Sequence, residues 1–221
     1  MPPAITRPAV RDDRDRRVHD AVHSLLAEQG MRLSMDAVAA RAGCSKQTLY
    51  ARYGNKQNLL KRVMREHFEL TTAPLDRDDG DIRECLVAFA EQHLDQLNRP
   101  DVVQTCRLID AESHQFPDEA RQIYHDGVAR LQHRLAQWLQ QAIDRGQLRH
   151  DDPHFMAELL LAMIVGLDFE RQRFHTPHRT AAQARRAWAE FSADSFLRAF
   201  APGALAPAAS PNSNRKRSFS R

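Results

Sequence analysis

The stretch 34–54 constrains the fold of this chain most, because it encodes two very short helices with almost nothing between them. Ser34 and Ser45 are of the residue type that caps helix N-termini, and Gly43 and Gly54 are of the type that ends helices. The spacing therefore predicts one short helix between each serine and the glycine that follows it. A three-residue connection from Gly43 to Ser45 is typical of a helix-turn-helix, in which the second helix crosses the first steeply and projects outward.

The rest of the chain carries helical signals as well, and nothing in it favours a strand. The 221 residues include 8 glycines and 11 prolines. No stretch shows the sustained alternation of polar and β-branched residues that is typical of strands. We therefore predict an all-α protein. Besides the two short helices, we expect helices over the ranges 16–29, 55–71, 82–98, 101–115, 117–146, 152–175 and 179–200.

These helices divide into two domains with unstructured ends. Residues 14–72 are predicted to form the helix-turn-helix domain with its connecting helix, and residues 73–200 a larger helical domain. We expect residues 1–13 to be a flexible arm. Residues 201–221 are low in complexity and carry four basic residues near their end, which predicts a disordered basic tail.

The net charge of +3 conceals an uneven distribution along the chain. Residues 1–72 carry 13 basic and 8 acidic side chains, whereas residues 73–211 carry 15 basic and 21 acidic ones. A basic N-terminal domain on an acidic body indicates that the N-terminal domain meets a polyanion. Charge alone leaves duplex DNA, RNA and a lipid surface open as that polyanion.

Composition argues against a membrane or secreted protein. No apolar run approaches 20 residues, the mean hydropathy is −0.60, and the N-terminus has no apolar signal region. Three scattered cysteines are too few for a disulfide framework. We expect a soluble protein of the cytoplasm, associated with the nucleoid and without a membrane partner.

The second short helix presents polar side chains that suit a DNA groove. Leu49 packs inward, which leaves Lys46, Gln47, Thr48 and Tyr50 pointing outward near the helix N-terminus. Gln47 offers a bidentate amide for adenine, Lys46 can bond guanine or phosphate, and Thr48 can contact a thymine methyl group. The alternative is an ordinary three-helix domain whose polar helix only faces solvent.

Residues at the edges of this motif suit the sugar-phosphate backbone. Tyr50 and Tyr53 are flat and hydroxyl-tipped, and Ser34 and Lys56 each stand at a helix N-terminus, where phosphate binding is favoured. The ordered run of motif residues resembles the DNA-binding domain of TetR-family transcriptional regulators over roughly 14–64. The matching residues are Ser34, Ala39, Ala42, Gly43, Ser45, Leu49, Tyr50, Tyr53, Lys56, Leu59 and Leu60.

The resemblance implies a recognition helix that contains Ser45, Lys46, Gln47, Thr48 and Tyr50. It also implies that Ser34, Tyr53 and Lys56 are phosphate anchors. Two substitutions depart mildly from the family pattern, since Cys44 stands where valine is usual and Tyr53 where phenylalanine is common. Gln47 occupies a position often held by a small residue, which makes it a candidate specificity determinant. Cys44 is a small hydrophobic residue or, alternatively, a redox sensor at a helix N-terminus.

The body carries a pattern that suggests self-association. Residues 155–167 include a single polar residue, Glu158, so this helix must be buried on more than one side. The last helix adds a stripe of aromatic and small residues. Together these helices predict a four-helix interface between two copies of the chain, as the resemblance also implies; the alternative is that both helices fill the core of one subunit. The candidate interface residues are Phe155, Leu159, Met163, Trp188, Phe191, Ser195 and Ala199.

The resemblance further implies a small-molecule effector that binds in the body. The segment 107–117 resembles the AefR-like subgroup of TetR C-terminal domains. No dense cationic cluster marks the body for an anion, which favours an apolar or amphipathic effector. Candidate pocket residues, for each of which ordinary core packing is the alternative, are Phe89, His93, Cys106, Ile109, Phe116, Tyr124, Trp138, Met163 and Leu167.

These observations predict a dimeric repressor that binds a near-palindromic operator and is released when an effector shifts the connecting helix at about 55–71. We expect no metal and no cofactor, because no histidine pair is accompanied by cysteine at zinc-site spacing. An enzyme with a helical pocket is the competing class, but no nucleophile elbow, phosphate loop or dinucleotide fingerprint is present. A DNA-binding architectural protein without an effector is a third hypothesis.

Overall fold

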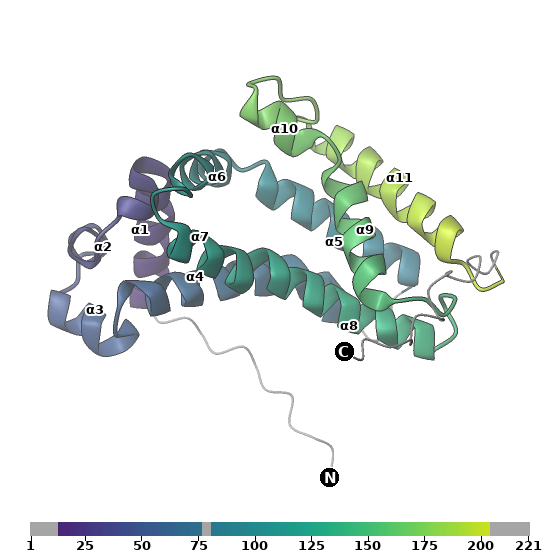
Figure 1. The fold of residues 1–221 in the computed structure, drawn as a ribbon, viewed down its shortest axis with the longest axis horizontal. Helices are drawn as coiled ribbons and strands as arrows, with labels where there is room; N and C mark the ends of the chain where they lie inside the picture. Colours follow the sequence, from purple (N-terminus) through teal and green to yellow (C-terminus); the bar gives the residue numbers. More distant parts are fainter. Residues whose placement is uncertain (1–12, 77–80, 204–221) are drawn as a thin grey trace, which may run out of the picture.

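The computed structural model describes residues 13–76 and 81–203, and it consists of helices joined by short turns (Figure 1). No strand occurs in this part of the chain, which confirms the predicted all-α class. Figure 1 shows a small group of helices at one end and a longer group that extends away from it. We call these groups the head and the body.

The head consists of α1 (Asp13–Gln29), the 3₁₀ turn η1 (Gly30–Arg32), α2 (Met35–Ala42) and α3 (Lys46–Tyr53). Its helices form because each buries one apolar face against the others and against the start of the next helix. The buried residues that form this core are Val18, Ala21, Val22, Leu25, Leu26, Leu33, Met35, Val38, Ala39, Ala42, Leu49, Tyr53, Leu59, Leu60 and Val63.

The predicted caps of the two short helices are confirmed. The Ser34 hydroxyl accepts a hydrogen bond from the Ala37 amide at 3.2 Å, and the Ser45 hydroxyl accepts one from the Thr48 amide at 3.1 Å. Gly43 ends α2 in the left-handed conformation, with φ of 64°, where a side chain would cost about 1–2 kcal/mol. This turn redirects the chain so that α3 crosses α2.

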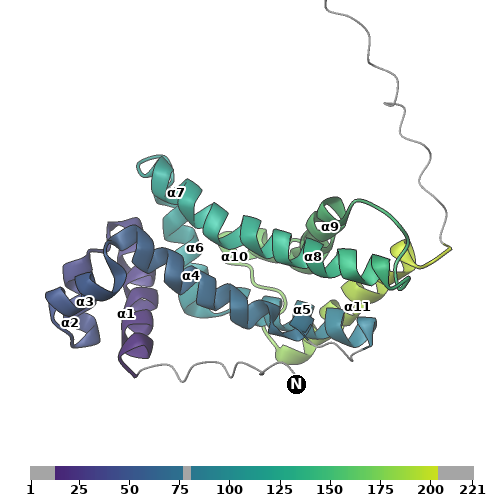
Figure 2. The same cartoon turned by 90° about the horizontal axis from the view of Figure 1, so that it is seen from below.

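Helix α4 (Lys56–Thr72) begins in the head and ends in the body, as both cartoon views show (Figures 1 and 2). Asn55 caps it by accepting from the Asn58 amide at 2.8 Å. The body helices that follow, with the short 3₁₀ turn η2 first, are η2 (Ala73–Asp76), α5 (Ile82–Leu97), α6 (Pro100–Glu112), α7 (Pro117–Tyr124), α8 (Arg130–Asp144), α9 (Pro153–Val165), α10 (Asp168–Arg173) and α11 (Ala182–Phe200).

Two predicted body helices differ from their expected form. The range 117–146 is one rod of helix, but a π-helical turn over His125–Ala129 separates α7 from α8. The predicted helix 152–175 is broken at Gly166, which has φ of 52° and redirects the chain into the short α10. The reason is tertiary: Trp188 packs over Gly166, and a Cβ there would lie 3.2 Å from its ring.

The body core lies mainly between α5, α8, α9 and α11. In this core α5 packs along α11, and α8 packs along α9. The largest fully buried side chains include Phe89, Phe196, Leu135 and Leu139. This cluster shares no buried residue with the head core, so the two domains have separate hydrophobic cores.

The predicted arm (1–13) lies almost entirely outside the described residues, and so does the predicted tail (201–221) apart from its first three residues. Within the described ranges, no helix has the length and the hydropathy needed to cross a bilayer.

Candidate nucleic-acid interface and ligand cavity

Helix α3 presents a polar face to solvent at one end of the molecule (Figure 1). Leu49 is 1% exposed and anchors the helix to the head core, whereas the Tyr50 ring is 47% exposed. The side chains of Lys46 and Gln47 are also exposed. The side chains predicted to read DNA bases therefore lie together on one accessible surface.

Two contacts hold the N-terminal end of α3 in place. The Lys46 ammonium group lies 2.6 Å from a carboxylate oxygen of Asp36 in the first turn of α2. The hydroxyls of Ser45 and Thr48 lie 2.8 Å apart. Because both members of the Lys46–Asp36 pair are largely exposed, the pair stabilises the fold little in water, and the Lys46 ammonium group remains accessible to solvent.

Tyr53 is not on the outer surface where the sequence places it. It is 5% exposed, and its hydroxyl donates a hydrogen bond of 2.7 Å to the Asp15 carboxylate on α1. Arg52 and Arg62 also pair with Asp15, at 2.5 and 3.2 Å. Tyr53 thus fixes α3 against α1 and α4, because its aromatic ring lies on the core side of α3.

Asp15 is the buried charge at the centre of this network. Burial by itself raises the pKa of Asp15, but the hydrogen bonds from Tyr53 and Arg52 outweigh it and hold this pKa below its ordinary value. Burial and the hydrogen bond to Asp15 together raise the pKa of Tyr53, so its hydroxyl stays protonated. The network therefore consists of an ionised acceptor and donors that remain charged or protonated at neutral pH.

The other two predicted phosphate anchors stand at helix N-termini, as expected. Ser34 is the exposed N-cap of α2, and its hydroxyl accepts from the Ala37 amide. Lys56 begins α4, and its ammonium group donates to the main-chain carbonyl of Met31 in η1. Lys56 thus ties the start of α4 to the turn that precedes α2.

A cavity of about 430 Å³ lies where the head meets the body. Its walls are almost entirely apolar, and they come from both domains because α1 packs directly against α6. His23 and Leu26 of α1 are the wall residues from the head. The body and connecting-helix residues that line it are Met64, Phe68, His93, Leu97, Val102, Thr105, Cys106, Ile109, Ile123, Gly127, Val128, Leu131, Leu161, Ala162, Val165 and Phe169.

Three of the nine predicted pocket residues, His93, Cys106 and Ile109, line this cavity. The other six do not. Phe89 and Trp138 are buried in the body core, and Met163 packs against that core from α9. Phe116 is the half-buried residue before α7, while Tyr124 and Leu167 are more than half exposed. Composition identifies apolar residues, but only the helix crossings decide which ones border a space.

Among the few polar groups in the cavity wall, His23 and Cys106 are uncharged. Burial lowers the pKa of His23, and burial raises the pKa of the Cys106 thiol, so both groups are neutral near pH 7. The His93 ring stacks on the buried Phe89 ring with centroids 6.0 Å apart. With Thr105, these groups supply a small number of hydrogen-bonding positions in an apolar space, which suits a neutral, largely apolar molecule.

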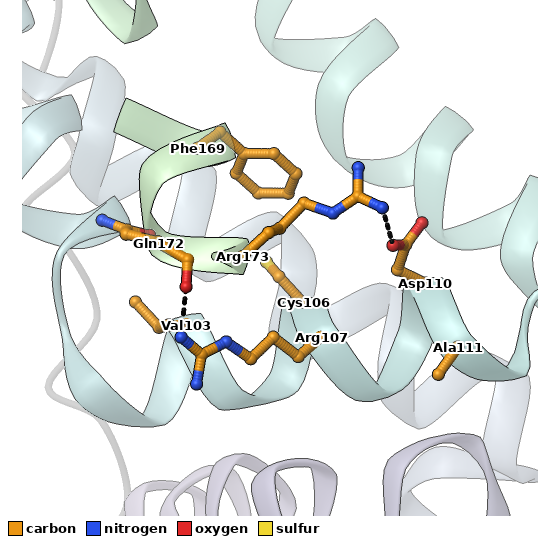
Figure 3. Close-up of a pocket in the computed structure, with 8 residues that line it drawn as sticks. All are labelled: Val103, Cys106, Arg107, Asp110, Ala111, Phe169, Gln172 and Arg173. Carbon is orange, nitrogen blue, oxygen red and sulfur yellow. Dashed lines mark hydrogen bonds and ion pairs between the residues drawn. The ribbon is translucent and has the colours of Figure 1, made fainter. Parts of the chain in front are cut away.

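Helix α10 forms one wall of the cavity and is clasped to α6 (Figure 3). Arg107 of α6 donates to the main-chain carbonyl of Gln172, and Arg173 of α10 pairs with Asp110 at 3.0 Å. A second, smaller cavity of about 210 Å³ lies at this seam. Cys106 and Phe169 border both cavities.

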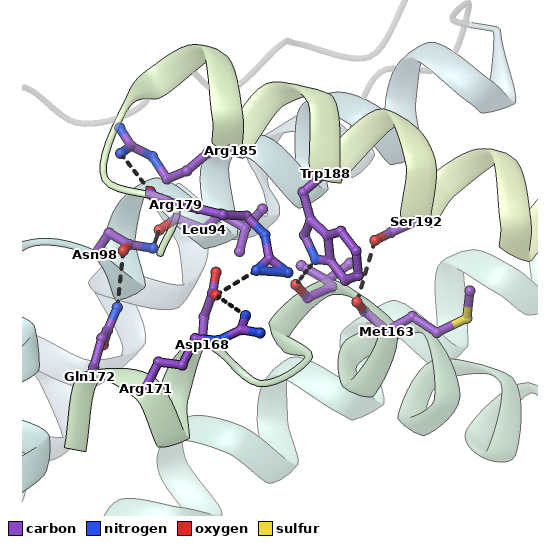
Figure 4. A network of polar contacts seen from close by, with 11 residues as sticks. Leu94, Asn98, Met163, Asp168, Arg171, Gln172, Arg179, Arg185, Trp188 and Ser192 are labelled. Carbon is purple, nitrogen blue, oxygen red and sulfur yellow. Dashed lines mark hydrogen bonds and ion pairs between the residues drawn. The ribbon is translucent and has the colours of Figure 1, made fainter. Parts of the chain in front are cut away.

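A polar network fixes the position of α10 from the opposite side (Figure 4). The buried pair Asp168–Arg179 joins α10 to the segment before α11, with a nitrogen–oxygen distance of 2.5 Å. The Arg179 guanidinium lies 3.9 Å from the centre of the Trp188 ring. The Trp188 indole in turn donates to the Ile164 carbonyl at 2.8 Å. These contacts hold the chain after the Gly166 break and place Phe169 in the cavity wall.

Helices α9 and α11 leave an apolar surface exposed on the outside of the body. Phe155, Leu159 and Phe191 are 72%, 46% and 58% exposed, and Ala199 of α11 is exposed as well. Of the other predicted interface residues, Met163, Trp188 and Ser195 are partly buried, and Trp188 stacks on Phe191 at 5.5 Å. Large aromatic side chains left in water at this density indicate a surface that another protein surface covers.

No group of three or more His, Cys, Asp and Glu side chains within the described ranges is arranged to hold a metal ion.

Comparison with known proteins agrees with this geometry. The model of the bacterial regulatory proteins of the tetR family matches residues 19–63, and that of the AefR-like transcriptional repressor C-terminal domain matches residues 84–202. An uncharacterized helix-turn-helix transcriptional regulator of Bacillus subtilis, YvkB, is 22% identical over 83% of this chain and 95% of its own length. A Mycobacterium tuberculosis regulator, Rv1556, is 32% identical over 56% of this chain and 60% of its own length.

Two solved structures share the fold over most of both chains. The flavonoid-responsive regulator FrrA superposes with a TM-score of 0.65 at 31% identity, covering 86% of this chain and 98% of its own. A TetR-family regulator from Mesorhizobium loti superposes with a TM-score of 0.67 at 23% identity, covering 85% and 96%.

The fold and the matched domains define a helix-turn-helix transcriptional regulator that binds DNA. The chain belongs to the TetR family, with a C-terminal domain of the AefR-like type.

Replacing Tyr53 by phenylalanine tests the network around Asp15. We expect Tyr53→Phe to lower the free energy of unfolding by about 1.5–3 kcal/mol, because it removes a buried hydrogen bond to a charged acceptor. A carboxyl whose pKa is depressed stabilises the fold above its unfolded pKa of about 3.9 and ceases to do so as the pH falls through its folded pKa. The difference from wild type should therefore shrink in urea titrations below about pH 4. Tyr50→Phe is the matched control, and equal stability of the two variants would contradict the role of the Tyr53 hydroxyl.

Proposed function

We propose that this protein is a dimeric repressor that binds a near-palindromic operator and leaves it when a small effector enters the cavity between head and body. The observation that carries this proposal is the composition of the cavity wall. His23 and Leu26 belong to the same helix bundle as the recognition helix, so an occupant of the cavity touches the DNA-binding domain itself. Such contact couples occupancy to the position of α3.

Base contacts are assigned to α3. Gln47 and Lys46 are exposed beside each other, and Tyr50 and Thr48 flank them on the same helix. Ser34 and Lys56 are assigned to phosphates on either side, and Ser45 to the N-terminus of the recognition helix. Tyr53 positions α3 without contacting DNA. Phosphate contacts fix the register of the helix, and base contacts read the sequence.

The second copy of the chain is assigned to the exposed face of α9 and α11. A four-helix interface would cover Phe155, Leu159 and Phe191, whose exposure in a single subunit is costly. Two-fold symmetry would then present two recognition helices to half-sites one helical turn, or a multiple of it, apart. A regulator of this kind acts in the cytoplasm, on the chromosome.

The effector class is inferred from the cavity and from one relative. A cavity of about 430 Å³ with neutral histidine, threonine and thiol groups suits a neutral, flat molecule with a few hydroxyl or carbonyl groups. The related regulator FrrA is flavonoid-responsive. We infer that the effector of this chain is a flavonoid or a molecule of similar size and polarity.

Sequence-specific operator binding is tested with DNA from the promoter region of the protein's own gene. We expect Gln47→Ala to weaken binding by about 1–3 kcal/mol and to relax the preference at one base position, because a bidentate contact is lost. Lys56→Met should weaken binding to all sequences alike. Fluorescence anisotropy on a set of single-base operator variants separates the two outcomes, and identical profiles for both variants would overturn the assignment of α3.

Occupation of the cavity is tested by filling it. We expect naringenin, a flavonoid, to raise the melting temperature of the wild-type protein, and we expect Ile109→Trp to abolish this rise because the indole takes up the space. Saturation to 100 times the dissociation constant corresponds to about 2.7 kcal/mol of stabilisation, which thermal shift resolves. Ile109→Leu keeps the volume and serves as the control. An unchanged naringenin response in Ile109→Trp would place the effector elsewhere.

The dimer surface is tested by charge. We expect Phe155→Glu combined with Phe191→Glu to convert the dimer into monomers, because two carboxylates per subunit would be buried without partners. Sedimentation velocity measures the change. Phe174→Glu is the matched control, since Phe174 is 73% exposed but lies outside the proposed interface. Dissociation by the control alone would move the interface to that end of the body.

A further inference from the structure

Helix α6 lies between the head and the body and contributes no residue to the hydrophobic core of either. Glu112, its last residue, is the one α6 residue that is buried. A helix with so few buried apolar side chains can shift without breaking a packed core.

The same helix lines the effector cavity. Val102, Thr105, Cys106 and Ile109 recur at a helical spacing and form the α6 part of the wall. Any molecule that fills the cavity therefore presses against α6. Helix α6 also packs along α1 of the head, whose His23 and Leu26 line the same cavity.

Glu112 binds η1, the turn that connects α1 to α2. One carboxylate oxygen accepts a hydrogen bond of 2.8 Å from the Met31 amide, and the other lies 3.0 Å from the Arg32 guanidinium. Gly30 makes this approach possible, because a Cβ at that position would collide with the Glu112 carboxylate. The φ of 58° at Gly30 is a second reason why glycine stands there.

Turn η1 lies next to Lys56 and Ser34, two residues that we assign to DNA contact. The Met31 carbonyl accepts from Lys56, so the same residue is bonded by α6 through its amide and by α4 through its carbonyl. Ser34, the N-cap of α2, follows three residues later. The position of η1 thus sets the start of the helix-turn-helix and the position of the Lys56 ammonium group.

We propose that Glu112 is a positioning residue that transmits occupancy of the cavity to the DNA-binding head. This inference rests on the proposed function, since it requires an effector in the cavity. Displacement of α6 withdraws the carboxylate from Met31 and Arg32 and releases η1. A buried carboxylate that loses its donors is unfavourable, so the contact has two distinct states, made or broken.

The polar contacts that α6 makes with α10 and with η1 fit such a movement. Arg107 and Arg173 tie it to α10 on the far side of the cavity, and Glu112 ties it to η1 on the head side. An occupant that enlarges the space between α1, α4 and α6 strains both ties. Of these ties, the Glu112 tie is the one that reaches η1 in the head, so its loss is the change that we assign to signalling toward the recognition helix.

The test compares wild type with Glu112→Gln and Glu112→Ala, and uses Glu84→Gln on α5 as the matched control. Glu84 is exposed in the first turn of α5. Operator affinity is measured by anisotropy with and without naringenin. In wild type we expect naringenin to weaken binding by about 5- to 150-fold, the usual range of effector coupling.

In Glu112→Ala we expect weaker operator binding without naringenin and a response to naringenin reduced to less than about threefold, because the contact that the effector breaks is already absent. Glu112→Gln retains an acceptor for the Met31 amide but loses the charge that pairs with Arg32, so an intermediate response is expected. A residue that only stabilises the fold would lower affinity and leave the naringenin ratio at its wild-type value. A wild-type ratio of operator affinities without and with naringenin, found in both Glu112 variants, would overturn the proposal.

Hydrogen exchange of the Met31 amide provides a second readout that needs no effector. We expect operator DNA to slow this exchange in wild type and in Glu84→Gln, and to leave it faster in both Glu112 variants. Equal Met31 exchange in wild type, Glu84→Gln and Glu112→Gln overturns the proposed role of Glu112 even if Glu112→Ala fails to fold, because Glu112→Gln is isosteric.

The failure of the proposed function has a different signature. Wild-type protein that shows no sequence preference for its promoter, or whose operator complex ignores naringenin, contradicts the repressor or the flavonoid assignment. In the second case, hydrogen exchange of the Met31 amide still tests the proposed contact between Glu112 and η1. If naringenin weakens operator binding normally in wild type and by the same ratio in the Glu112 variants, only the proposed role of Glu112 is contradicted.

Discussion

The packing of α1 against α6 is the contact on which the rest of the structure depends. The head and the body have separate hydrophobic cores, so they are joined only by the continuous helix α4 and by surfaces that meet outside both cores. Where α1 meets α6, the two surfaces do not close completely, and the space left is the cavity. One interface therefore determines both where the head sits and where a small molecule can enter.

On each side of that interface, a buried carboxylate fixes the position of one helix. In the head, Asp15 gathers Tyr53, Arg52 and Arg62 and orients α3 from behind, which leaves the outer face of α3 for DNA. In the body, the buried pair Asp168–Arg179 orients α10 from behind and leaves Phe169 in the cavity wall. In both places a buried carboxylate that costs desolvation is held by donors and yields a fixed geometry, which is what a recognition surface requires.

How well the sequence predicted each part of the site depended on how far apart in the chain the interacting residues lie. The caps at Ser34 and Ser45 are local, and the sequence predicted them correctly. The cavity wall was predicted in part, because His93, Cys106 and Ile109 line it but Phe89 and Trp138 are core residues. His23 and Leu26 were missed, since no local pattern distinguishes a head residue that faces the body from one that faces its own core.

By itself, the sequence determined the helical class, the order of the helices and the polar face of the recognition helix. These features depend on hydrogen bonds within a few residues and on the period of apolar side chains, both of which can be read along the chain. Only the tertiary structure decided that Tyr53 is buried against Asp15, that α9 stops at Gly166, and that Glu112 holds the Met31 turn. Each of these joins residues far apart in the chain, and their meeting depends on the angles at which whole helices cross.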